Sequence, residues 1–154
     1  MPQITPFLWY DSQAEEAMNF YLSIFKSGKV LNLQRRDGKV FSASFELLGQ
    51  RFIALNGGPH FKFTEAVSFF VDCEPQAEVD ELWDQLIAGG GSPGRCGWLK
   101  DKFGLSWQII PKALGKLMGD PDPKKAHAVL QAMLKMNKII IADLERAHEA
   151  AEAA

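Results

Sequence analysis

The segment ITPFLWYDSQAEEAMNFYLSIF, residues 4–25, decides the fold that we predict for the first half of the chain. Its first part, residues 4–10, is an apolar run that suits a β-strand. Ser12 and Glu15 form the pattern of a capping box, in which each side chain accepts a hydrogen bond from an unpaired backbone N–H at the helix start. The second part carries apolar residues on one helical face, namely Ala14, Ala17, Met18, Tyr21, Leu22 and Phe25. We therefore expect a strand followed by an amphipathic helix.

Three strand-like runs follow this helix, at residues 30–36, 40–47 and 51–56. Asp37-Gly38 separates the first two and predicts a tight hairpin turn, because both residues tolerate positive φ. In the middle run apolar and more polar residues alternate, which predicts one buried and one more polar face. The first half therefore has the pattern of a βαβββ module.

The second half repeats this order more weakly. Residues 66–72 form an apolar run, and Glu74-Pro75 then opens a helix at the position where proline costs least. The pairs Phe20-Tyr21 and Leu82-Trp83 hold the same place on their helices, an offset of 82 minus 20, or 62 residues. After three glycines at 89–91 we expect a short strand or loop to Cys96, a strand at 98–100, a turn at 101–104 and a last strand at 105–110.

We expect one domain over residues 1–154, with a first half at 1–60, a second half at 61–112 and a helical extension at 113–154. Asp122-Pro123 starts one helix of this extension, and another is expected at 139–150. These helices should pack on the sheet or on a second subunit.

Composition excludes several classes of function. The formal net charge is -2 and the charges are interspersed, so we expect no nucleic-acid partner. No apolar run approaches the roughly 20 residues that span a bilayer, and the start does not have the form of a signal peptide. We expect a cytoplasmic protein without a membrane partner, in which Cys73 and Cys96 are reduced thiols.

Several motifs, in a specific order along the chain, resemble one known family. They are Ile4-Thr5-Pro6-Phe7-Leu8-Trp9, Ala14-Glu15-Glu16-Ala17 with Phe20-Tyr21, Ala54-Leu55-Asn56-Gly57-Gly58-Pro59, Cys96-Gly97-Trp98-Leu99-Lys100-Asp101, and Gly104-Leu105-Ser106-Trp107-Gln108. On them the chain is identified as a member of the PhnB-like branch of the glyoxalase, bleomycin-resistance and dioxygenase superfamily, also called vicinal oxygen chelate proteins. Similar sequences also carry the label of a demethylubiquinone methyltransferase.

The resemblance implies an α+β fold in which paired βαβββ modules form a curled mixed sheet, or cup, with the helical extension added, and it implies a homodimer. The sequence has no Gly-rich strand-to-helix loop followed by an acidic residue, so it does not itself predict S-adenosylmethionine binding.

Enzymes of this superfamily usually hold a divalent metal through His, Gln or Glu on inward-facing strand positions. The matching positions on the first strand are Ile4 or Pro6, which cannot bind a metal. In the second half the match is Ala66, with Glu65 expected on the other face, and on the last strand Gln108 replaces the usual Glu. We therefore expect neither a typical metal site nor a cofactor.

The candidate ligand-binding residues are Asn56, Ser68, Trp98, Ser106 and Gln108. Ser106 and Gln108 share a strand face, Ser68 is inward by analogy with Ala66, and Trp98 offers an aromatic wall. Asn56, before two glycines, could reach the mouth of the pocket. The alternative for each is structural: a hydrogen-bonded strand residue, a turn residue or a packed ring.

Other polar and aromatic residues suggest structural roles. Alternation puts Trp107 opposite Gln108, against a helix, and Trp9 and Trp83 are expected in the cores of their halves. His60 lies in the linker between the halves and could serve as a general base only if it had a partner.

Three functions remain in competition. The chain could bind a small organic molecule in the cup without a typical metal site. It could be an atypical lyase, isomerase or dioxygenase with a site around Gln108 and Asn56. It could also be a dimeric interaction or regulatory protein whose own side chains fill the cup. The sequence identifies neither substrate nor catalytic residues.

Overall fold

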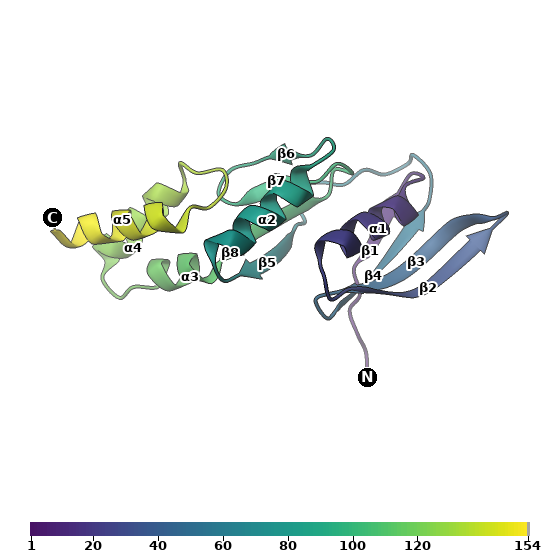
Figure 1. The fold of residues 1–154 in the computed structure, drawn as a ribbon, viewed down its shortest axis with the longest axis horizontal. Coiled ribbons are helices and arrows are strands. Elements are labelled where there is room, and N and C mark those ends of the chain that lie inside the picture. The colour runs from purple at the N-terminus through teal and green to yellow at the C-terminus, as the bar shows by residue number, and fades with distance from the viewer. Residues whose placement is uncertain (154) are drawn as a thin grey trace. The chain divides into compact units, whose positions relative to one another are not determined.

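The computed structural model describes residues 1–153 and divides into two compact units, Met1–Phe63 and the part from Thr64 onward (Figure 1). The last residue of the predicted extension lies outside the described part. The expectation that the whole chain behaves as one domain stays a prediction. No helix within residues 1–153 has the length and apolar character needed to cross a membrane.

The first unit is a βαβββ module, as the sequence predicts. Its elements are β1 (Phe7–Tyr10), α1 (Ala14–Ile24), β2 (Lys29–Arg36), β3 (Lys39–Leu47) and β4 (Gln50–Asn56), and the strand order is β1-β4-β3-β2. β1 and β4 are parallel and the other pairs antiparallel. Asp37 and Gly38 have φ values of 52° and 79°, so the predicted hairpin turn is confirmed.

The predicted capping box of Ser12 and Glu15 is wrong. Helix α1 begins at Ala14 after Gln13, and no local side chain caps it. Instead, Asn56 at the end of β4 accepts a hydrogen bond from the Ala14 N–H through Oδ1, at 2.8 Å. Asn56 is paired with Tyr10 across the sheet, so it stands where β1 leads into the helix. A long-range cap therefore satisfies a donor for which the sequence suggested a local partner.

The second unit repeats the module. It contains β5 (Phe69–Cys73), α2 (Gln76–Ile87), β6 (Ser92–Pro93), β7 (Trp98–Lys100) and β8 (Ser106–Pro111), in the order β5-β8-β7-β6. β5 begins three residues later than the predicted run, because Thr64 accepts hydrogen bonds from the N–H groups of Ala66 and Val67 and holds this segment in a turn.

The two modules correspond with a small shift. The helices keep the predicted offset of 62 residues, since Tyr21 and Trp83 are both buried. The strands before them differ: buried Leu8 of β1 corresponds to buried Val71 of β5, an offset of 71 minus 8, or 63. The loop from strand to helix is one residue shorter in the second half, which accounts for the change.

The extension consists of α3 (Lys112–Met118), α4 (Pro123–Met133) and α5 (Ile141–Ala153). Asp122 caps α4 by accepting from the Lys124 N–H at 3.0 Å, with Pro123 in the first turn. The helices pack on the second unit around a buried cluster of Ile110, Leu114, Val129, Ile139 and Leu144. Packing on the sheet, the first of the two predicted alternatives, is therefore what the structure has.

Candidate functional site

The face of the second sheet opposite α2 carries a row of three side chains across three strands. Phe70 of β5 pairs with Gln108 of β8, and Gln108 pairs with Trp98 of β7. Trp107 and Leu99, the neighbours of this row, are buried on the α2 side, so alternation places the row on the other face. We call Phe70, Gln108 and Trp98 the Gln108 row.

Gln108 is held in a defined orientation. Its Nε2 donates to the Ser68 hydroxyl at 3.0 Å, and both residues are partly buried. Within residues 1–153 the Gln108 side chain has no other hydrogen bond, so Oε1 is left as an acceptor beside the row. The structure thus brings together two of the predicted site residues.

Ser106 lies two residues before Gln108 on the same strand face. It is 1% exposed, and its Oγ has no hydrogen-bond partner within the described residues. A buried hydroxyl without a hydrogen-bond partner lowers the stability of the fold by about 1–3 kcal/mol. A further polar group that formed a hydrogen bond with Ser106 would therefore be stabilising.

Trp98 is positioned by the turn that precedes it. Cys96 and Gly97 both have positive φ, 59° and 85°. Their N–H groups donate to the carbonyl oxygens of Met136 and Asn137, each at 2.8 Å. A Cβ at Gly97 would lie 2.6 Å from Ile110 Cδ1, so any other residue would have to adopt a positive φ and displace the end of the Ile110 side chain. The C-terminal extension therefore fixes the start of β7.

The turn at 101–104 is confirmed, and Asp101 organises it. This carboxylate is 2% exposed and accepts hydrogen bonds from the N–H groups of Phe103 and Leu105 and from Trp107 Nε1, at 2.9, 3.1 and 3.0 Å. Trp107 is buried, so its predicted role in the core is confirmed.

Two charged residues near the row form an ion pair. Lys100, two residues after Trp98, forms an ion pair with Glu65, and its hydrogen bond lowers the pKa of the Glu65 carboxyl. The expectation that Glu65 points to the other face is wrong, because residues 64–67 form a turn in which strand alternation does not apply.

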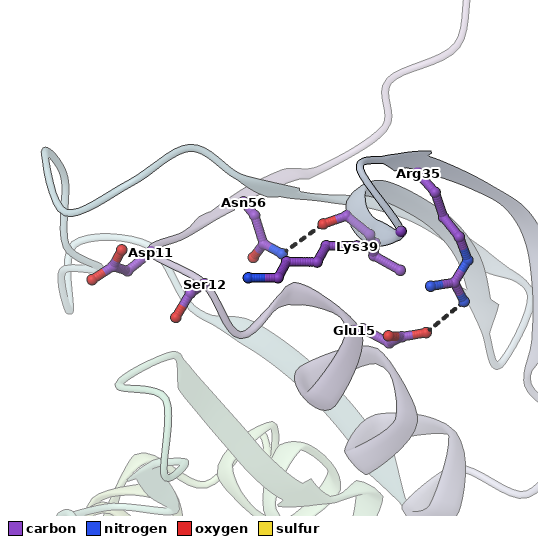
Figure 2. Close-up of a pocket in the computed structure, with 8 residues that line it drawn as sticks. Asp11, Ser12, Glu15, Arg35, Lys39 and Asn56 are labelled. Carbon is purple, nitrogen blue, oxygen red and sulfur yellow. Dashed lines mark hydrogen bonds and ion pairs between the residues drawn. The ribbon is translucent and has the colours of Figure 1, made fainter.

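Asn56 lies in the first unit, in a polar pocket of about 370 Å³ at the start of α1. Its Nδ2 donates to the Val40 carbonyl at 3.0 Å while Oδ1 caps the helix, so both ends of the amide support the fold. Figure 2 shows this hydrogen bond and, at another wall, the ion pair of Glu15 with Arg35, 3.2 Å apart. The remaining lining residues are Asp11, Ser12, Gly38, Lys39 and Val40.

Two further aromatic predictions have different outcomes. Trp83 is buried on α2, so its core position is confirmed. Trp9 is not in the core: it is partly exposed on the face opposite α1, its Nε1 donates to the Gly58 carbonyl at 2.9 Å, and its ring meets Phe61 edge-on at 4.9 Å. His60 is exposed.

Sequence reasoning missed Phe70. Ser68 was identified as inward, and alternation then puts Phe70 on the same face, two residues on. The apolar run at residues 66–72 predicted a strand and gave Phe70 no role in the site, whereas this side chain is 55% exposed.

Comparison with known proteins places this fold in a class. Solved structures with the same fold include a protein of Pseudomonas aeruginosa (20% identity, TM-score 0.60, covering 72% of this chain and 98% of that one). They also include the fosfomycin resistance protein FosX of Listeria monocytogenes, in complex with Mn(II) and sulfate (14% identity, TM-score 0.51, covering 69% and 86%). The fold is thus that of the glyoxalase, bleomycin-resistance and dioxygenase superfamily.

The profile of the 3-demethylubiquinone-9 3-methyltransferase family matches residues 2–110, and the chain belongs to this family, the PhnB-like branch of the superfamily. A putative 3-demethylubiquinone-9 3-methyltransferase, PhnB protein, of Bacillus cereus is 35% identical, with a TM-score of 0.66, over 71% of this chain and 99% of that one. A search among curated proteins found no match. Helices α3 to α5 follow the region that the profile matches.

The residues of this face do not fit the divalent metal that superfamily enzymes use. Ile53 of β4 stands where β8 has Gln108, because Ile53 pairs with Phe7 as Gln108 pairs with Phe70. Within residues 1–153 no group of three or more His, Cys, Asp or Glu side chains lies close enough to hold a metal ion. A metal-free site stays a prediction.

Proposed function

We propose that this protein binds a small organic molecule, without a metal, on the face of its second sheet opposite α2. Gln108, Ser68, Ser106 and Trp98 are the proposed ligand-binding residues. The observation that carries the proposal is the Gln108 amide, which Ser68 holds so that Oε1 remains an acceptor on a partly exposed face.

The chemistry of the face favours binding over proton transfer. It offers an amide, two hydroxyls and aromatic surface, and amides and hydroxyls are weak general acids and bases near neutral pH. The nearby ionised groups, Lys100 and Glu65, neutralise each other. A ligand N–H or O–H would donate to Gln108 Oε1, and its apolar surface would pack on Trp98.

The other expectations remain part of the proposal. Asn56 belongs to the polar pocket of the first unit, and its participation in ligand binding is a separate hypothesis. We infer a cytoplasmic homodimer from the resemblance to the family and from the sequence.

Native mass spectrometry of freshly purified protein tests the proposal. We expect a retained small molecule with no stoichiometric metal, and we expect Gln108→Leu to lose the retained mass. Gln34→Leu is the matched control, since Gln34 is an exposed glutamine on a strand of the first sheet and should leave the retained mass unchanged. A divalent metal that disappears in the Gln108→Leu protein would refute the metal-free site and favour an enzyme.

A further inference from the structure

We propose that the Gln108 row selects a planar, uncharged aromatic molecule with a carboxamide-like edge, held between Phe70 and Trp98 with that edge on Gln108. This inference rests on the proposed function, and it names the class of ligand that the same site would take.

The spacing of the row fits one flat ring. Gln108 is the direct strand partner of both Phe70 and Trp98, so the two aromatic residues are two strand spacings apart, or about 10 Å. Aromatic rings stack with centroids about 4.5–7 Å apart, so a single ring inserted between the two needs about 9–10 Å at the close end of that range. A saturated ring is thicker and gains no stacking.

Phe70 is available for such a contact. It is a large apolar side chain with 55% of its surface exposed, although it lies in a strand whose next residue, Val71, is buried. A single exposed apolar residue needs no explanation. Here, however, the exposed ring is aligned with a second aromatic across an oriented amide.

The amide determines the polar edge. With one Nε2 hydrogen engaged by Ser68, Gln108 offers Oε1 as an acceptor and a second N–H as a donor. A primary carboxamide or lactam presents the complementary donor and acceptor on one edge. The Ser106 hydroxyl, two residues before Gln108 on the same strand face, has no partner within residues 1–153 and adds polar capacity beside the middle of the row.

Charge argues against an ionised ligand. Lys100 is paired with Glu65, and the remaining charge on this face of β5 is Asp72, two residues from Phe70. An anion would find no unpaired cation among these groups and would be repelled by Asp72. A neutral molecule loses less solvation on entering the site than either ion.

The first sheet supplies a natural comparison. The corresponding row there is Phe7, Ile53 and Ser44, which pair in the same order. This row retains one exposed aromatic residue but has an aliphatic side chain in the middle and a hydroxyl in place of the second ring. It should not bind the probe, and Phe7→Ala is therefore the matched control for Phe70→Ala.

The test is a titration of the full chain with benzamide, followed by two-dimensional ¹H–¹⁵N NMR of the Gln108 side-chain amide and the Trp98 indole. We expect benzamide to move both signals, and we expect cyclohexanecarboxamide, benzoate and benzamidine to bind at least about fivefold more weakly. Phe70→Ala and Trp98→Ala should each weaken benzamide binding about fivefold, whereas Phe7→Ala should not. Dispersed spectra of each variant establish that it is folded.

The results separate this inference from the proposed function. Equal binding of benzamide and cyclohexanecarboxamide, or tighter binding of either ion, would overturn the aromatic and uncharged class while leaving a ligand site at Gln108. No shift with benzamide would also overturn the class if native mass spectrometry still finds a retained molecule that Gln108→Leu loses. If benzamide causes no shift and native mass spectrometry finds no retained molecule, the proposed function itself is overturned.

Discussion

The two halves of this protein share one topology and differ in what their open faces carry. Both have the strand order in which the first strand runs parallel to the last, and both bury an aromatic residue of the helix, Tyr21 or Trp83. On the opposite faces, Phe7, Ile53 and Ser44 correspond to Phe70, Gln108 and Trp98. Packing against the helix limits change on one face, and the other face can acquire polar and aromatic groups.

The halves also protect their sheet edges differently. β2 is eight residues long and covers most of β3, with charged residues such as Lys29 and Arg36 and two register shifts that discourage pairing with another chain. β6 is two residues long. So short a strand does not pair with Cys96 and Gly97. The N–H groups of these two residues instead donate hydrogen bonds to the carbonyl groups of Met136 and Asn137.

In each half an amide side chain near the start of the helix bonds to main-chain groups, but only in the first half does it cap that helix. In the first half Asn56 reaches from the sheet to Ala14. In the second half Gln76, the first residue of α2, donates to the Ile139 carbonyl at 2.9 Å and accepts from the Ile141 N–H at 2.7 Å. The second half therefore uses the extension for contacts that the first half makes within its own module.

The largest effect is expected at Gly97. Gly97→Ala should lower the free energy of unfolding by about 3 kcal/mol, because a left-handed alanine costs about 1–2 kcal/mol and overpacking costs about 1–3. Gly38→Ala is the control, since Gly38 has a similar φ of 79° but open space around it, and should cost only about 1 kcal/mol. Urea denaturation measures both. Equal losses would mean that the contact with Ile110 and Ile139 is not restrictive.

The next effect concerns Cys73, which corresponds to Tyr10 of the first half. Burial, followed by the nearby carboxylates of Glu78 and Asp72, raises the pKa of the Cys73 thiol from 9.0 to about 11. Its thiolate fraction at pH 8 should be about 100-fold below that of an ordinary thiol, so it should react about that much more slowly with iodoacetamide. Mass spectrometry should find Cys96 modified first, and a Cys96→Ser protein should stay largely unmodified.

The same shift in pKa predicts a loss of stability at alkaline pH. Folding favours the protonated thiol, so this contribution is present below pH 9.0 and is lost as the pH rises toward 11. Rapid alkylation of Cys73 in the folded protein would show that the thiol is more accessible than its burial indicates.

The two amide contacts should give a smaller effect. Asn56→Ala and Gln76→Ala should each lower the free energy of unfolding by about 1–2 kcal/mol, since each removes a cap or two hydrogen bonds to the main chain. Asn32→Ala, at an exposed position of β2, is the control and should change stability by less than about 0.5 kcal/mol. If only Asn56→Ala lowered the free energy of unfolding, the hydrogen bonds of Gln76 with the extension would contribute little to stability.

The smallest effect is the acid dependence of one ion pair. A hydrogen bond from Lys138, followed by one from Gln76, lowers the pKa of Asp80 below 3.8. The stability from this pair is therefore present above pH 3.8 and is lost as the pH falls through the lowered value. Lys138→Met should flatten the decline in unfolding free energy below about pH 4, and the exposed-site control Lys116→Met should not. An unchanged slope would mean that the pair is equally formed in the unfolded chain.

Local patterns predicted much of this fold. Alternation, the Asp37-Gly38 turn and the helical spacing around Tyr21 and Trp83 identified both modules, because the residues that determine them are neighbours in sequence. Long-range contacts were not predictable in this way. The cap of α1 comes from Asn56, 42 residues beyond Ala14, and the edge of β7 is completed from residues 136–137. The loop between the first strand and the helix is also one residue shorter in the second half, so the strands of the two halves correspond at a different offset from the helices.

The candidate site was predictable in part. Alternation, together with the family resemblance, placed Ser68, Ser106 and Gln108 on one face, and the structure joins Ser68 and Gln108 by a hydrogen bond. Alternation from Ser68 would have placed Phe70 on the same face, but an apolar run does not by itself show whether a phenylalanine within it is exposed or buried. The polar pocket at Asn56 depends on Arg35 and Lys39 of the hairpin as well, which sequence spacing does not bring together.

The carbonyl contacts at Cys96 and Gly97 limit how this protein can be shortened. A chain cut just after Pro111 would keep the whole region that the family profile matches, but it would leave two amide groups and the side chain of Ile110 uncovered. Any relative that ends at this strand has to satisfy the same N–H groups and cover the same apolar side chain with other residues. Sequence differences between such relatives and this protein should therefore concentrate around the Gly97 turn, which adjoins the proposed ligand site.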